Sequence, residues 1–393
     1  MAEMIYLDHA ATTPVRREVA EAMAMCMTEA GHFANPGSDH APGRQAAHIV
    51  EQARERFAAL IGAKAEDIVF TSGATESNNM ALLGGAAFYS NKGKRIALAK
   101  TEHKSVLDPC RQLASRGWSL DWLETDEQGL ITTQALIAAM TDETCLASCM
   151  LVNNETGVVH NIPALARVCG EAQVLLHVDA AQALGKLPIE ARRWDVAMMS
   201  FSAHKLGGPK GVGALYLRRK PPVKVQPLVF GGGQERGLRS GTLPVHQIVG
   251  LVRAAELAEA EREQMFRHLG RLRRRLLDQL VAGLPQVEVN GAQTAQSPHI
   301  LNLSFHGVDG EALRADLIDL AVSSGSACTS DHAESSYVLR ALGRSDSLSD
   351  ASLRFSFGPA TTAEQVDQAA QRVIASVRRL RALSPLWSEE AAA

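Results

Sequence analysis

Short apolar runs alternate with segments of helical spacing through the first half of the sequence. Five of these runs have the length of buried strands and lie at residues 67–71, 95–99, 118–123, 144–152 and 174–178. Two further apolar runs follow, at residues 196–201 and 212–217. This alternation predicts an α/β protein with a largely parallel sheet covered by helices, and ligand-binding loops at the carboxyl ends of its strands.

The pattern changes after Gly241. Residues 245–284 form a long, charged helical region, which we interpret as a bridge between two lobes. Beyond it we expect two strands, a helix between them, and a final helix. These segments lie at residues 300–305, 353–357 and 310–320, and the final helix begins at Thr361 with a capping box that ends at Glu364.

A chain of 393 residues is too long for one ordinary small domain. We therefore predict a large domain over residues 16–262. A smaller α+β domain would combine residues 1–15 with residues 263–393.

The net charge and the spacing of the cysteines limit the classes of protein to which the chain can belong. Forty Lys and Arg against 43 Asp and Glu give a net charge of −3, which does not predict binding to nucleic acid or to an anionic membrane. The six cysteines include no CxxC pair and no zinc-like Cys/His cluster, so free thiols in a reducing cytosol are expected. No signal peptide or membrane-spanning apolar stretch is present, and the sequence predicts a cytoplasmic location.

Lys205 lies in a loop of small residues between two apolar runs. Open α/β folds bind their ligands at the carboxyl ends of the strands, which is where this lysine is expected to lie. Partly shielded from water, its amine could act as a nucleophile on a carbonyl group. Taken alone, a lysine in such a loop is more often simply solvated, and only the rest of the sequence favours a functional role.

The segment Ser72-Gly73-Ala74-Thr75 lies between an expected strand and an expected helix. Free backbone N–H groups and the positive end of the helix dipole favour an anion there, most often phosphate. The alternative is an ordinary helix start capped by the Thr75 or Ser72 side chain.

Asp179 and His103 each follow a strand. A carboxylate at the end of a buried strand needs either a structural base or a cationic ligand. His103 could stack on a flat ring, or it could serve as a structural histidine at a helix start.

Cys328 and Arg354 are the two candidates in the last third of the chain. Residues 323–330 include no large side chain, so we expect an accessible thiol, although an incidental cysteine is the alternative. Arg354 alternates with apolar neighbours and could point inward to bind a carboxylate, or form a structural salt bridge. Together these candidates suit pyridoxal phosphate (PLP) acting on an amino acid.

Several motifs, in this order along the chain, resemble those of the PLP-dependent cysteine desulfurases. They are residues 71–76 (TSGATE), 101–104 (TEHK), 153–157 (NNETG), 177–182 (HVDAAQ), 202–205 (SAHK), 237–242 (GLRSGT) and 324–330 (SGSACTS). The similarity runs from about Tyr6 to about Leu380, and the long cysteine loop is typical of the IscS-like branch. The resemblance implies the fold type I of PLP-dependent transferases.

The resemblance also implies a role for each matching residue. Lys205 would hold PLP as a Schiff base, and His103 would stack on the ring and carry protons. Asp179 would pair with the pyridinium nitrogen, and Gln182 would bind the ring hydroxyl. The phosphate would be bound by Ala74, Thr75, Ser202 and His204, and Thr242 would reach the phosphate of the neighbouring subunit. Asn154 and Arg354 would hold the substrate carboxylate.

By the same resemblance, Cys328 takes the sulfur of L-cysteine as a persulfide and alanine is released. The family is dimeric and passes sulfur to an iron–sulfur scaffold protein and to tRNA thiolation partners. No intrinsic metal is implied, although Cys328 would transiently ligate a nascent iron–sulfur cluster. Residues 387–393 do not match the scaffold-docking tail of the branch.

Two other functions fit parts of the sequence. A different PLP enzyme of this fold, such as an aminotransferase or a selenocysteine lyase, would not need a thiol at position 328. A binding protein of this fold would not react with PLP at Lys205. Cysteine desulfurase activity explains more of these residues than either alternative.

Overall fold

The computed structural model describes residues 4–324, 335–384 and 387. Within them, one sheet has seven strands, ordered β2 (Ile68–Thr71), β8 (Gly213–Leu217), β7 (Met198–Ser202), β6 (Leu175–Asp179), β5 (Thr144–Ser148), β3 (Arg95–Ala99) and β4 (Ser119–Leu123). All neighbouring strands are parallel except that β8 runs antiparallel to β2 and β7. The predicted, largely parallel sheet is therefore correct. β8 is reversed because residues 203–212 are too few for a crossover connection.

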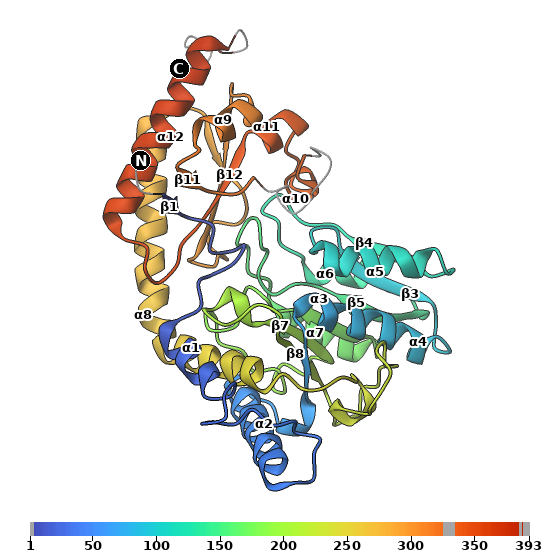
Figure 1. The fold of residues 1–393 in the computed structure, drawn as a ribbon. Coiled ribbons are helices and arrows are strands. Elements are labelled where there is room, and N and C mark those ends of the chain that lie inside the picture. The colour runs from blue at the N-terminus through green and yellow to red at the C-terminus, as the bar shows by residue number, and fades with distance from the viewer. Residues whose placement is uncertain (1–3, 325–334, 385–386, 388–393) are drawn as a thin grey trace.

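Helices cover both faces of this sheet (Figure 1). They are α1 (Arg17–Ala24), α2 (Ala41–Leu60), α3 (Ala74–Asn79), α4 (Gly85–Tyr89), α5 (Lys104–Ala114), α6 (Thr133–Ala139) and α7 (Ile162–Glu171). The consecutive buried residues Val69 and Phe70 belong to two different apolar clusters, because side chains alternate between the faces of a strand. Both faces are thus buried. A π-helical turn, Met80–Gly84, joins α3 to α4.

The long helix α8 (Val245–Gly283) connects two apolar cores. Ile248 and Leu251 pack into the core under the large sheet, whereas Leu272 and Leu276 pack into a second core. Figure 1 shows α8 running from α1 and α2 toward the C-terminal helix α12 (Ala363–Leu383).

The second core contains a three-stranded antiparallel sheet in the order β12 (Ser352–Ser356), β10 (Ile300–Phe305) and β9 (Val287–Val289). The N-terminal strand β1 (Ile5–Tyr6) joins this region by pairing in parallel with β11 (Leu320–Ala321). Three short helices complete it: α9 (Gly310–Asp316), α10 (Tyr337–Ala341) and α11 (Asp346–Asp350). No helix in the described residues is long and apolar enough to cross a membrane.

Two sequence-based predictions in this region are wrong. The helix expected over 310–320 ends at Asp316, and β11 follows it. The capping box of α12 pairs Thr362 with Gln365 rather than Thr361 with Glu364. The Thr361 hydroxyl instead accepts a hydrogen bond from the backbone N–H of Gly358, so it closes the preceding turn.

Candidate active site

A cavity of about 540 Å³ lies at the carboxyl ends of the central strands. Most of the residues expected at the site line it: Ala74, Thr75, His103, Asn154, Asp179, Gln182, Ser202, His204, Lys205 and Arg354. Thr242 is exposed and does not line this cavity. Cys328 lies outside the described residues. The chain therefore brings together residues from both ends of its sequence at this one cavity.

Lys205 ends a single 3-10 turn, Ala203–Lys205, directly after β7. Its amine donates hydrogen bonds to the carbonyl oxygens of Ala10 (2.6 Å) and Ala11 (2.7 Å). The solvated-loop interpretation is therefore wrong. The N-terminal segment that holds this amine was missed by the sequence analysis, because backbone carbonyls leave no signal in residue types.

The N-terminus of α3 has no side-chain cap. Gly73 occupies the N-cap position with φ 152°, and neither Ser72 nor Thr75 accepts a hydrogen bond from the first turn. The ordinary-cap interpretation is therefore wrong, and the first backbone N–H groups remain for an anion. Ser202 and His204 line the cavity beside this helix end.

The imidazole of His204 is neutral at pH 7. Burial lowers its pKa to about 4, and the positive charge of Lys205 adds to this effect. Its Nδ1 lies 3.1 Å from the Thr12 hydroxyl. His204 can thus donate or accept a hydrogen bond without adding a charge.

Asp179 is 7% exposed and accepts hydrogen bonds from two neutral groups. The donors are Nδ2 of Asn78 on α3 (2.8 Å) and the backbone N–H of Ala181 (2.9 Å). Neither donor neutralises the carboxylate, so a protonated ring nitrogen would complete its environment. Asn78 was also missed, because its contact with Asp179 joins residues 101 positions apart.

His103 caps α5. Its Nδ1 accepts a hydrogen bond from the backbone N–H of Ser105 (3.1 Å). Burial lowers the pKa of His103, partly offset by the negative charge of Asp179. The structural interpretation is correct, yet His103 also lines the cavity, and the cap leaves Nε2 for a ligand.

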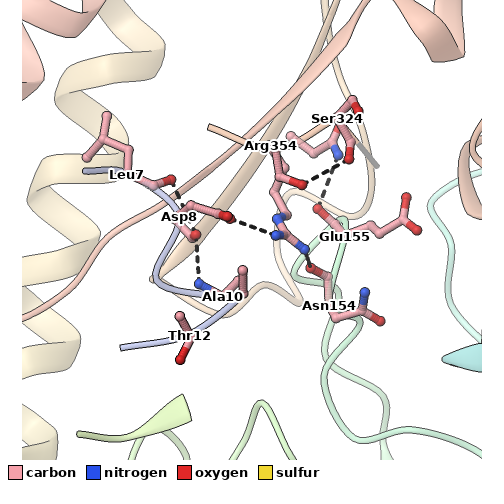
Figure 2. Close-up of polar contacts among 12 residues, drawn as sticks. Leu7, Asp8, Ala10, Thr12, Asn154, Glu155, Ser324 and Arg354 are labelled. Atoms are coloured by element: carbon pink, nitrogen blue, oxygen red, sulfur yellow. Dashed lines mark hydrogen bonds and ion pairs between the residues drawn. The ribbon is translucent and has the colours of Figure 1, made fainter. Parts of the chain in front are cut away.

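Arg354, on β12, is 4% exposed and lies between two segments (Figure 2). One terminal nitrogen forms an ion pair with Asp8 Oδ1 (2.8 Å), and the other donates to the Asn154 carbonyl (2.8 Å). The structural salt bridge is therefore present. However, Nε of Arg354 and Oδ1 of Asn154 are both buried without a hydrogen-bond partner, which is costly unless a ligand satisfies them.

These features fit PLP together with an amino acid. The uncapped helix end suits the phosphate, Asp179 suits a pyridinium nitrogen, and Lys205 suits an aldehyde carbon. The unsatisfied Nε–H of Arg354 suits a substrate carboxylate, whereas the unsatisfied Oδ1 of Asn154 needs a hydrogen-bond donor. Among the described residues, no group of three or more His, Cys, Asp or Glu side chains could hold a metal ion.

Comparison with known proteins agrees with this geometry. Residues 5–369 match the family model described as aminotransferase class-V. The chain is 50% identical to cysteine desulfurase IscS of Pseudoalteromonas translucida (strain TAC 125) and 52% identical to that of Vibrio campbellii (strain ATCC BAA-1116). Each match covers 98% of this chain and 95% of the relative.

A solved structure described as a NifS-like protein has the same fold. It superposes with a TM-score of 0.89 at 33% identity, covering 96% of this chain and 100% of that one. The fold class, the enzyme class and the cofactor expected from the sequence are confirmed. The chain belongs to the class-V aminotransferase family and, within it, to the IscS-type cysteine desulfurases.

Proposed function

We propose that this protein removes the sulfur atom of L-cysteine, giving L-alanine and a persulfide on Cys328. The sulfur then passes to acceptor proteins, namely an iron–sulfur scaffold protein and tRNA thiolation partners. The observation that carries the proposal is the convergence of Lys205, Asp179 and Arg354 on one cavity. Membership of the IscS-type family supports it.

Each of these residues would have its own role in the reaction. Arg354 holds the substrate carboxylate through its unsatisfied Nε–H, and Asn154 would join it by donating from Nδ2. His103 and the Lys205 amine move protons at the substrate, and bound PLP supplies an electron sink for charge that develops at the α carbon. Asp179 keeps the ring nitrogen protonated, and the α3 N-terminus holds the phosphate.

Sulfur transfer would be a displacement at the substrate sulfur. The Cys328 thiolate attacks that sulfur, so an S–S bond forms while the bond from sulfur to the β carbon breaks. The electron pair of the broken bond stays with the carbon skeleton, which takes up a proton and leaves as alanine. No external oxidant is required.

We further propose that the protein acts as a homodimer in which Thr242 reaches the phosphate site of the partner subunit. Its exposure and its absence from the cavity of its own chain support this role. The two apolar cores support a large domain over 16–262 and a small domain formed by 1–15 and 263–393. The five described cysteines are buried and free, as suits the reducing cytoplasm.

The substitution Cys328→Ser tests the proposed reaction. We expect loss of alanine and sulfide production from L-cysteine, with the visible absorbance of bound PLP unchanged. Cys26→Ala, which removes a thiol remote from the cavity, is the control and should keep its activity. Full desulfurase turnover by Cys328→Ser would favour another PLP enzyme, and protein that stays colourless with added PLP would favour a binding protein.

A further inference from the structure

A second cavity, of about 220 Å³, lies behind Lys205. Lys205 lines both cavities, which otherwise have different walls. The rear cavity is formed by the N-terminal segment, α8 and residues 357–360, and its walls are mainly apolar. Among the side chains that line it and that the proposed reaction does not use are Lys186 and His299.

These two side chains bind the same atom. Lys186 Nζ (3.4 Å) and His299 Nε2 (3.2 Å) both contact Oε1 of Gln182, which lines the front cavity. On its other side, Gln182 Nε2 donates to the carbonyl oxygen of Ala10 (2.8 Å). That carbonyl also accepts the hydrogen bond from the Lys205 amine. A continuous set of contacts therefore joins the rear cavity to Lys205.

The hydrogen-bonding chemistry leaves Gln182 one orientation. The Ala10 carbonyl can only accept, so the Gln182 amide must turn its NH₂ group toward it. Oε1 then faces the rear cavity and needs donors there. Lys186 has only donors, and His299 can donate from Nε2 because its Nδ1 lies 2.6 Å from the Ser297 hydroxyl, which can donate to it.

The charges around Lys186 make its protonation sensitive to Lys205. The titratable groups lining the rear cavity are His9, Arg16, Lys205, Glu261 and His299. Arg16 and Glu261 neutralise each other in an ion pair of 2.7 Å. Burial lowers the pKa of His9 to about 4 and that of His299 well below its usual value, so both are neutral near pH 7.

Among these groups, Lys205 is the cation whose charge acts on Lys186. Burial, and to a lesser extent the positive charge of Lys205, lower the pKa of Lys186 to about 7. Coulombic coupling is mutual, so a charge on Lys186 also opposes a charge at Lys205.

We propose that Lys186 and His299 are positioning residues, which orient the Gln182 amide and thereby hold the Ala10 carbonyl against the Lys205 amine. Through its charge, Lys186 also sets the pH at which the group formed at Lys205 gains or loses its proton. This inference rests on the proposed function, because it assumes that Lys205 carries PLP.

The test compares pairs of variants in the full-length protein loaded with PLP. Lys186→Met has no charge at any pH, whereas Lys186→Arg is charged at every pH. The readout is the pH midpoint of the absorbance change of bound PLP. We expect the lowest midpoint for Lys186→Arg, the highest for Lys186→Met, and a spread of roughly 0.5 to 1 pH unit.

The histidine pair separates orientation from charge. His299→Gln keeps a donor where Nε2 lies, whereas His299→Leu removes it. The rate at which apo-protein takes up PLP should fall several-fold in His299→Leu and stay near the parent value in His299→Gln. Lys94→Met, an exposed lysine that lines neither cavity, should match the parent in both measurements.

Two negative results have different meanings. If the parent protein binds no PLP at Lys205, the proposed function fails. If the parent binds PLP normally but the Lys186 variants share one midpoint and the two His299 variants take up PLP at one rate, this inference alone fails. Should the apolar variants fold poorly, the midpoint of Lys186→Arg relative to the parent still decides, since a downward shift is required.

Discussion

The two walls of the main cavity are built in different ways. On one wall, Asp179 and Ser202 are the last residues of the neighbouring strands β6 and β7, Lys205 ends the turn after β7, and α3 begins beside them. On the other wall, Arg354 is fixed by Asp8, which lies 346 positions away in the sequence. Most of the first wall comes from consecutive strand–loop–helix units, whereas the second depends on the N-terminal segment meeting β12.

This difference separates the two chemical tasks. The sheet wall presents rigid strand ends and a helix terminus to a flat phosphorylated ring. The Arg354 wall presents a guanidinium that is already paired but retains an unsatisfied Nε. We therefore expect changes on the sheet wall to affect cofactor binding and catalysis, and changes on the Arg354 wall to affect mainly substrate binding.

Replacing Lys205 by Ala should have the largest effect. The variant loses the amine that bonds to PLP and moves protons, so turnover should fall by at least about 10³-fold. Borohydride reduction followed by mass spectrometry should show PLP attached at Lys205 in the parent protein and no attachment in the variant. Attachment at another lysine, with activity kept, would contradict the assignment.

Asp179→Asn should have the next largest effect. An amide cannot stabilise a protonated ring nitrogen, so kcat should fall by roughly 10²- to 10³-fold while the variant still binds PLP. Steady-state kinetics together with the absorbance of bound PLP measures both quantities. A change confined to KM would place Asp179 with the substrate instead of the ring.

Arg354→Gln should raise KM for L-cysteine with little change in PLP binding. Loss of a buried charge-assisted contact to the carboxylate should reduce kcat/KM by about 100-fold. Asp8→Asn keeps the guanidinium and removes the charge of its partner, so its effect should be smaller. An equal loss of PLP from either variant would show that the two walls do not act separately.

The smallest expected effect is at Glu155, where a substitution should change the free energy of unfolding. Burial raises its pKa to about 7, although the Ser336 hydroxyl, 2.5 Å from Oε2, opposes this. Between the usual pKa of a glutamate and pH 7, the folded protein holds a proton that the unfolded chain has lost. Glu155 therefore destabilises the fold progressively as pH rises through this window, by up to about 3 kcal/mol.

Glu155→Gln should remove this dependence. Urea unfolding at pH 5 and pH 8 should show the variant gaining stability relative to the parent at the higher pH. Glu127→Gln, at an exposed position, is the control and should show no such gain. A parent protein whose advantage over the variant grows with pH would contradict the raised pKa.

The sequence by itself determined that the sheet is largely parallel and covered by helices, and it identified most of the residues at the strand ends. The runs 95–99 and 300–305 match the strands β3 and β10. In β3, which lies inside the parallel part of the sheet, burial on both faces favours nearly continuous apolar side chains. The motifs also predicted Lys205, Asp179 and Arg354 as residues of one site.

Only the tertiary structure decided what holds these groups in place. The Ala10 and Ala11 carbonyls on Lys205, Asn78 on Asp179, and Asp8 on Arg354 are contacts between segments far apart in the chain. The rear cavity with Lys186 and His299 arises in the same way. Local residue patterns encode which faces are buried, whereas the partner of a buried polar atom depends on which distant segment packs against it.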